Sequence, residues 1–72
     1  MNLANERFAA NLRAHRKRLG LSQEALALRA DLHRTEISLL ERRKRSPRLD
    51  TLIELARGLE LESVCELLDG VA

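Results

Sequence analysis

Residues 21–45, LSQEALALRADLHRTEISLLERRKR, decide the fold of this chain. Apolar residues recur at helical spacing in two short runs, which the pair Asp31-Leu32 separates. Helices this short cannot bury their apolar faces alone, so we expect the flanking segments to form a scaffold around them. The stretch therefore predicts two helices joined by a tight turn and supported on either side.

The first half of the stretch predicts a helix that begins after Ser22. Ser is a preferred N-cap residue, and Glu24 follows in the first turn. Leu26 and Ala30 mark the inward side of this helix. Asp31 interrupts the pattern with a residue type that tolerates a positive φ. A sharp turn at Asp31 is therefore expected.

The second half predicts a helix from about residue 33 or 34 to residue 41 or 42, with Ile37 and Leu40 facing the core. Five residues are left on its outer or flanking faces: Arg34, Thr35, Glu36, Ser38 and Leu39. Arg donates two bonds to guanine, Thr and Ser serve either role, Glu accepts from cytosine, and Leu touches a thymine methyl group. Taken alone, this face fits an ordinary solvated surface better than a base-reading one.

Four consecutive basic residues follow this helix: Arg42, Arg43, Lys44 and Arg45. Pro47 makes a continued helix unfavourable, so the basic run is expected to be a loop. Cations beside a helix of mixed chemistry are placed to bind phosphates while the helix reads bases. The combination favours double-stranded DNA as the partner.

The segment before this stretch predicts a helix from about residue 5 to Gly20, a C′ residue. Phe8, Leu12, His15 and Leu19 form its apolar stripe, and Arg13, Lys17 and Arg18 lie mostly off that stripe. His15 is interpreted as a packed, hydrogen-bonded core histidine.

The segment after the stretch predicts two more helices. One runs from about residue 49 or 50 to 59, and its apolar stripe is Leu49, Leu52, Ile53, Ala56 and Leu59. A short fifth helix is expected from about residue 62 or 63 to 68. Its apolar residues cover much of its circumference, which suggests burial against a partner as well as the core. The expected fold is all-α, a compact five-helix domain.

Composition limits the remaining possibilities. A chain of 72 residues makes one domain, and its single cysteine, Cys65, cannot form an internal disulfide. We find no metal-ligand spacing, phosphate loop or nucleophile-base-acid set, so neither a cofactor nor an enzyme is expected. No apolar run approaches a membrane span, and the N-terminus lacks the order of a secretory signal. A soluble cytoplasmic protein is expected.

Charge is distributed unevenly. Twelve of the thirteen Lys and Arg residues and five of the eleven Asp and Glu residues precede Leu49, which gives that part +7 and the remainder −5. The basic part can approach a polyanion while the acidic part stays away from it. By composition alone, a solvated surface with an accidental bias is an equal alternative.

Dispersed positions across four predicted helices resemble the phage repressor/Cro-type (XRE-like) helix-turn-helix family. These positions are Ser22-Gln23, Leu26-Ala27, Asp31-Leu32, Ile37-Ser38, Glu41-Arg42, Pro47, Leu49, Thr51-Leu52, Leu55-Ala56 and Leu59. The similarity covers about residues 8–68, and the segment LHRTEISLLER is most like restriction–modification controller proteins. The resemblance implies a lambda-repressor-like DNA-binding domain over residues 1–72, with its helix-turn-helix at about 22–42.

The resemblance also implies roles for individual residues. The base-reading residues would be Arg34, Thr35, Glu36, Ser38, Leu39 and Arg45. Gln23 would contact the DNA and Ser22 would lie near a phosphate, beside the phosphate contacts that the basic run already predicts at Arg42, Arg43 and Lys44. Arg16 and Glu41 match a partly buried salt bridge between the first and third helices. Three positions depart from the family pattern: Asp31 and Arg43 stand where Gly is common, and Glu36 stands where controller relatives often have an aromatic residue.

A regulator of this type is expected to bind a two-half-site DNA operator as a homodimer, because one recognition helix reads only a few base pairs. Val64, Cys65 and Leu68 on the fifth helix are the candidate dimer surface. A contact with RNA polymerase is left open. The alternative function is an antitoxin-like or other protein-interaction module that uses the same fold.

Overall fold

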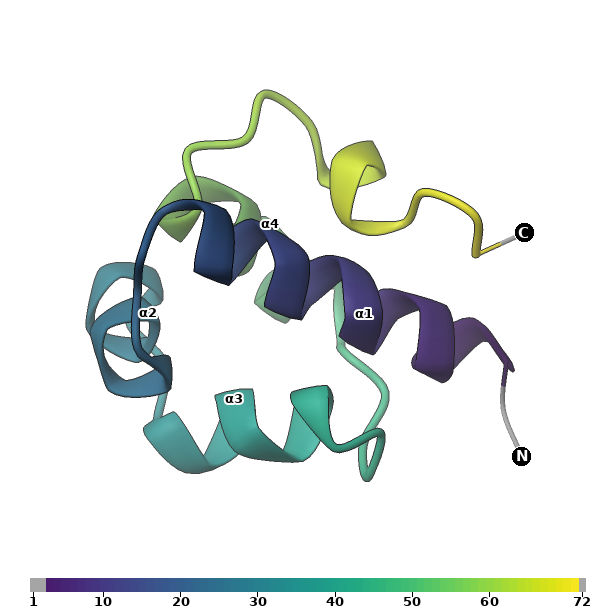
Figure 1. Ribbon diagram of the computed structural model, residues 1–72, viewed down its shortest axis with the longest axis horizontal. Coiled ribbons are helices and arrows are strands. Elements are labelled where there is room, and N and C mark those ends of the chain that lie inside the picture. Colours follow the sequence, from purple (N-terminus) through teal and green to yellow (C-terminus); the bar gives the residue numbers. More distant parts are fainter. Residues whose placement is uncertain (1–2, 72) are drawn as a thin grey trace.

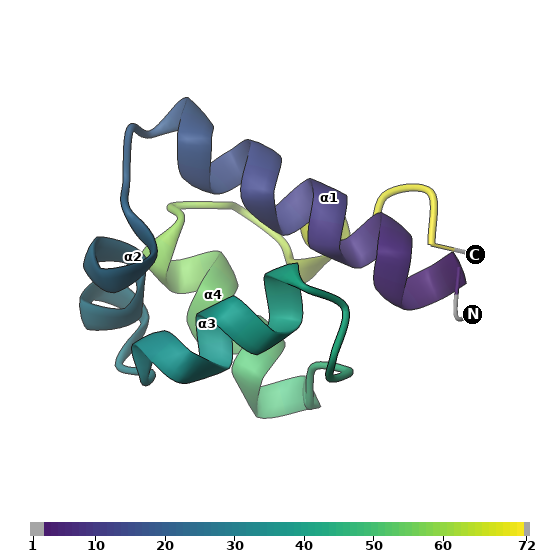
Figure 2. The ribbon, with the colours of Figure 1, turned by 60° about the horizontal axis from the view of Figure 1, so that its bottom comes forward.

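The computed structural model describes residues 3–71, which form four α-helices and one 3-10 turn (Figure 1). The elements are α1 (Leu3–Arg18), α2 (Gln23–Ala30), α3 (Arg34–Glu41), α4 (Leu49–Gly58) and the turn η1 (Val64–Leu67). Helix α2 packs against α3 and α4, while α1 packs against α3 and η1. Helix α3 lies at the edge of the molecule with α2 at its N-terminal end, and Figure 2 brings α3 to the front.

The expected fifth helix is wrong: the described chain contains only a 3-10 turn there. Ser63 caps this turn, because its Oγ accepts a hydrogen bond from the Cys65 N–H at 3.0 Å. The N–H of Glu66 donates to the Ser63 carbonyl and that of Leu68 to the Cys65 carbonyl, which is the i to i+3 pattern of a 3-10 helix. Gly70, at φ 78°, then turns the chain away. One turn of this kind is too short to become an α-helix.

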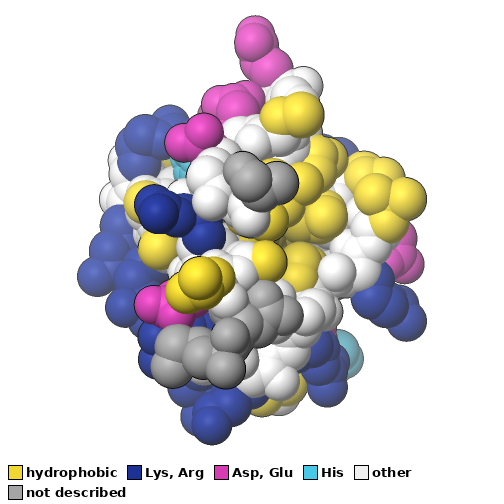
Figure 3. All heavy atoms as spheres, turned by 90° about the vertical axis from the view of Figure 1, so that its right-hand side faces the viewer, with side chains coloured by type: hydrophobic (Ala, Val, Ile, Leu, Met, Phe, Trp, Pro, Cys, Tyr) yellow, Lys and Arg dark blue, Asp and Glu magenta, His cyan; other side chains and the backbone are white. Residues whose placement is uncertain are grey.

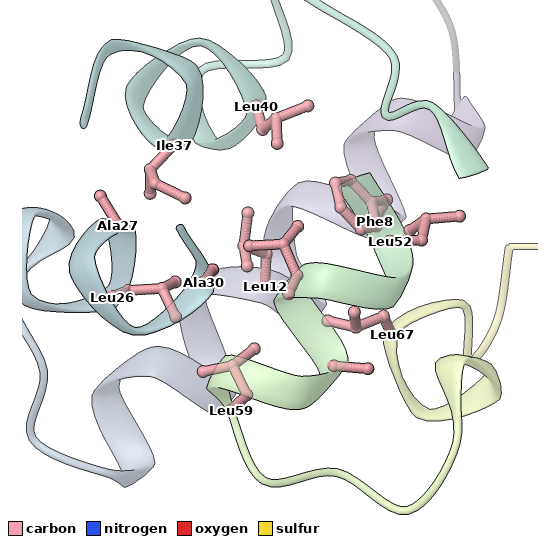
Figure 4. Packing of buried hydrophobic residues seen from close by; sticks show 12 residues of the cluster. Phe8, Leu12, Leu26, Ala27, Ala30, Ile37, Leu40, Leu52, Leu59 and Leu67 are labelled. Atoms are coloured by element: carbon pink, nitrogen blue, oxygen red, sulfur yellow. The ribbon is translucent and has the colours of Figure 1, made fainter. Parts of the chain in front are cut away.

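The core lies between the four helices and η1 (Figure 4). Its largest fully buried side chains are Leu12, Leu26, Ile37, Leu40, Leu55, Leu59 and Leu67. The inward positions expected from residues 21–45 are therefore confirmed. His15, expected in the core, is only half-buried; its Nε2 lies 3.3 Å from the Glu66 carbonyl oxygen. This histidine lies at the edge of the contact between α1 and η1.

Two residues of the expected α4 stripe are exposed instead of buried. The exposed fraction is 71% for Leu49 and 52% for Ile53, whereas Leu52, Leu55 and Leu59 are buried. The apolar surface of α4 is thus wider than the part that the core covers. Residues 49 and 53 are one turn apart, so both lie on the uncovered side.

All four α-helices end with the same hydrogen-bond pattern. The residues after them with positive φ are Gly20 (69°), Asp31 (57°), Arg43 (62°) and Glu60 (60°). In each case the N–H of the next residue donates to the carbonyl five positions earlier, as in a Schellman motif. The turn expected at Asp31 is confirmed. Only Gly20 has the residue type that adopts this backbone without strain.

Gly58 allows α2 and α4 to come close together. A Cβ atom built on Gly58 would lie 3.1 Å from the Ala30 backbone nitrogen and 3.2 Å from the Ala30 Cα. The Gly58 carbonyl also accepts a hydrogen bond from Arg29 Nε at 2.8 Å. Glycine in this last turn lowers helix propensity, but the packing of α2 on α4 requires it.

Candidate nucleic-acid interface

Helix α2 and the turn after it fix the direction of α3. Ser22 is the N-cap of α2, and its Oγ accepts a hydrogen bond from the Ala25 N–H at 3.0 Å. At the other end, the left-handed backbone of Asp31 lets the Leu32 N–H donate to the Ala27 carbonyl at 2.9 Å. Leu32 packs partly buried against the core. Helix α3 therefore starts at Arg34 with its outer face toward solvent.

The outer face of α3 brings together a strip of donors and hydroxyls. Arg34, Thr35, Ser38 and Arg42 line one shallow depression along the helix. Arg34, Thr35 and Arg42 are exposed and Ser38 is half-buried. These side chains follow one another at helical spacing, so a base-pair edge lying along the helix would meet them in turn.

The opposite flank of α3 faces the loop that leads to α4. Thr35, Glu36 and Leu39 line a groove there with Arg45 and Arg48, and residues of the turn before α3 and of α4 complete it. Arg45 Nη1 forms an ion pair with Glu36 Oε1 across this groove. Two residues expected to read bases separately are thus bound to each other.

The basic run after α3 does not form one surface. Arg42 and Arg43 line a second groove, between the end of α3 and α1. Arg45 lies on the other flank with Glu36, and Lys44 is exposed in the loop between them. The left-handed backbone of Arg43 causes this division, because it reverses the chain direction within the run.

Two further cations line the groove between the end of α3 and α1, and the sequence pattern did not identify them as DNA contacts. Arg13 and Lys17 line it together with Arg42 and Arg43, and the small Ala10 and Ala14 also line it. The signal was available in the sequence: two cations four residues apart beside two alanines with the same spacing. Its meaning depends on which face of α1 meets α3, which the sequence alone does not give.

Arg16 and Glu41 form a bidentate salt bridge that joins α1 to α3. Arg16 Nε donates to Glu41 Oε2 at 2.6 Å and Arg16 Nη2 donates to Oε1 at 2.9 Å. The guanidinium also donates to the Leu21 carbonyl at 2.8 Å. The Glu41 side chain is 1% exposed and that of Arg16 is 11% exposed. The pair thus fixes α3 against the scaffold.

Gln23 also belongs to this network. Its amide donates to Glu41 Oε1 at 3.1 Å, while Ser22 beside it is exposed. Burial alone would raise the pKa of Glu41, but hydrogen bonds from Arg16 and Gln23, with the charges of Arg16 and Arg13, hold this pKa below its ordinary value. The bond to Glu41 in turn raises the pKa of Arg16. Gln23 is therefore oriented by a charged, buried partner.

The candidate dimer residues differ in their exposure. Val64 and Leu68 pack partly buried against the core, and Cys65 is exposed. Turn η1 packs on α4, the helix that leaves Leu49 and Ile53 exposed. Figure 3, the view onto the right-hand side of Figure 1, shows hydrophobic side chains gathered on one face of the molecule.

Residues 3–71 lack the features of a metal site and of a membrane-spanning helix. No group of three or more His, Cys, Asp or Glu side chains in this range could hold a metal ion. None of the helices described combines the length and the apolar character needed to cross a membrane.

Comparisons with known proteins identify the same helix-turn-helix in this chain. Residues 12–67 match the family model described as helix-turn-helix. The chain is 48% identical over 54 residues to control protein C.SmaI of Serratia marcescens, an alignment that covers 75% of this chain and 64% of that protein.

Two solved structures of restriction–modification controller proteins are also similar. C.AhdI from Aeromonas hydrophila superposes with a TM-score of 0.81 at 36% identity, covering 85% of this chain and 91% of that one. Wild-type C.Esp1396I superposes with a TM-score of 0.86 at 29% identity, covering 92% and 86%. The expected resemblance to controller proteins is confirmed at the levels of sequence and fold.

Proposed function

The chain belongs to the helix-turn-helix family of DNA-binding regulators, and on that premise we propose that it is a restriction–modification controller that binds its operator as a homodimer. The observation that best supports this proposal is the arrangement of side chains on the outer face of α3. Arg34, Thr35 and Ser38 lie along it in one depression that Arg42 closes at the far end. Helix α3 would enter the major groove with these side chains toward base edges, and Leu39 on its flank would touch a thymine methyl group.

Contacts to phosphates would come from both sides of α3. Arg42 and Arg43, with Arg13 and Lys17 in the same groove, supply four cations on one side. Lys44 in the loop is a further phosphate contact, and the exposed Ser22 at the start of α2 is another. Such contacts fix the register of a protein on the duplex and make its affinity depend on salt.

The dimer surface would lie on η1 and on the exposed side of α4. Val64, Cys65 and Leu68 supply part of it, and the exposed Leu49 and Ile53 extend it. This part of the chain is also the acidic one, so it would face away from the phosphates. Two copies joined there would present two α3 helices to half-sites about one helical turn apart.

Selection of bound fragments from a random duplex pool tests the DNA-binding part of the proposal. We expect enrichment of a two-fold symmetric sequence with half-sites about 10 base pairs apart, centre to centre. A duplex with one intact half-site should bind more weakly than the full operator. Equal affinity for the selected operator and a scrambled duplex at physiological salt would refute operator recognition.

Sedimentation of variants tests the dimer. Ile53→Glu and Cys65→Glu, made separately, should lower the mass in solution from dimer to monomer, because each places a charge on the proposed surface. Leu28→Glu is the matched control, since Leu28 is 81% exposed on α2. A dimer that survives both first substitutions would place its interface elsewhere.

The same proposal places the protein in the cytoplasm, where operators are accessible. It also includes RNA polymerase as a second partner of the DNA-bound protein. In-vitro transcription from a template that carries the selected operator tests this contact. Operator occupancy should raise or lower the transcript level in step with binding. Unchanged transcription at full occupancy would exclude a regulatory role at that site.

A further inference from the structure

The ion pair between Glu36 and Arg45 joins a residue of α3 to a residue of the following loop. The Glu36 side chain is 19% exposed and that of Arg45 is 54% exposed. The carboxylate thus lies against the groove wall, while much of the guanidinium faces solvent. Of the two, Arg45 is the group that a ligand lying on α3 can reach.

We propose that Glu36 is a positioning residue, which orients Arg45 toward a guanine and reads no base itself. The inference rests on the proposed DNA-binding function. A guanidinium has five N–H donors, and Arg45 uses Nη1 for Glu36. Recognition of guanine O6 and N7 needs two donors, so the remaining ones suffice. Only 19% of the Glu36 side chain is exposed, so to meet a cytosine its carboxylate would have to move out of the groove.

The backbone of the loop favours this arrangement. The left-handed conformation of Arg43 turns the chain back, and the Lys44 N–H donates to the Leu39 carbonyl at 2.9 Å. Arg45 therefore starts beside the second turn of α3, within reach of Glu36. A long Arg side chain has many rotamers, and a partner that restricts them before DNA binds reduces the entropy lost on binding.

Because of their opposite charges, substitution of Arg45 and substitution of Glu36 should change DNA affinity by unequal amounts. With Arg45 in place, the carboxylate of Glu36 is balanced, and the pair as a whole does not repel phosphates. Without Arg45, a negative charge would remain beside the DNA backbone. Loss of Arg45 should therefore cost more than the guanine contact, and removal of Glu36 in that background should restore part of the affinity.

A double-mutant cycle on DNA binding tests this inference. Wild type, Glu36→Ala, Arg45→Ala and the double variant are titrated against the selected operator, against operators with each base pair changed, and against random duplex. Wild type should prefer one guanine by about 5- to 150-fold, the range for a bidentate contact. Arg45→Ala should abolish that preference, and Glu36→Ala should reduce it several-fold at the same position.

The double variant and a neighbouring cation give the controls. The double variant should bind random duplex more tightly than Arg45→Ala, because the exposed carboxylate is gone. Arg48→Ala removes a cation that lines the same groove but pairs with Asp50, so it should weaken all binding and leave the guanine preference intact. Circular dichroism of each variant verifies that it is folded.

Three outcomes would overturn the inference. A change of preference at a different base pair in Glu36→Ala, additive with Arg45→Ala, would make Glu36 a base reader. An unchanged guanine preference in Glu36→Ala would reduce the contact to a surface ion pair. If wild type enriches no sequence from the random pool, the proposed function fails, and this inference fails with it.

Discussion

Helix α3 carries two glutamates, and their surroundings give them different tasks. Glu41 is 1% exposed and is bound by Arg16 and Gln23, whose own positions the packing of α1 and α2 fixes. Glu36 is 19% exposed and has a partner from a loop. A carboxylate surrounded by fixed donors holds helices together, whereas one paired with a mobile cation can orient that cation for a ligand. Residue type alone would not separate the two roles.

The largest expected effect concerns the buried pair. Glu41→Ala should lower the free energy of unfolding by about 3–5 kcal/mol, because it leaves the Arg16 guanidinium buried without its counter-charge. Glu36→Ala should change it by about 1 kcal/mol or less, as for exposed ion pairs. Urea unfolding of both variants measures the difference. Similar losses from both would break the distinction between the two glutamates.

Arg34 provides a contrast to Glu41, because its substitution should affect DNA binding and not stability. It is exposed at the start of α3, so Arg34→Ala should leave the free energy of unfolding nearly unchanged. The same substitution should cost roughly 1–3 kcal/mol of operator binding and relax preference at one base pair. Titration of operators with single base changes gives the measurement. A uniform loss on all duplexes would instead make Arg34 a phosphate contact.

Stability at acid pH should depend on Glu41, because the pKa of this carboxyl lies below its ordinary value. A carboxyl whose folded pKa is lower than its unfolded pKa stabilises the protein above the unfolded value, about 4.3. That stability is lost as the pH falls from there through the folded pKa. Unfolding measured between pH 7 and pH 2 should therefore show a loss that Glu41→Gln lacks. An identical pH dependence in the two proteins would contradict this assignment.

The helix-turn-helix could be predicted because its signals are local. Ser22 caps α2, Asp31 stops it, and Pro47 ends the basic loop, so each boundary is encoded within a few residues. The core of this stretch followed from the spacing of Leu26, Ile37 and Leu40. The candidate reading residues on α3 follow from the same spacing, because whatever does not face the core faces outward.

The remaining features depend on tertiary contacts. The residues of η1 have the apolar pattern of a helix, but a single turn has too few positions to distinguish α from 3-10 geometry. Leu49 and Ile53 fit an apolar stripe whose uncovered side only packing reveals. The split of the basic run follows from one left-handed residue, Arg43, which was expected only as a phosphate contact at a position where the family commonly has Gly.

The smallest expected effect comes from that residue and separates stability from binding once more. Arg43→Gly should raise the free energy of unfolding by up to about 1 kcal/mol, because glycine adopts φ 62° without the steric cost that a side chain has. The same change should weaken binding to every duplex and reduce the salt dependence by about one unit of slope. Arg43→Ala is the matched control: it removes the same charge but keeps the strained backbone, so it should lower the slope without the gain in stability. Equal stability of the two variants would show that the left-handed turn costs the fold nothing.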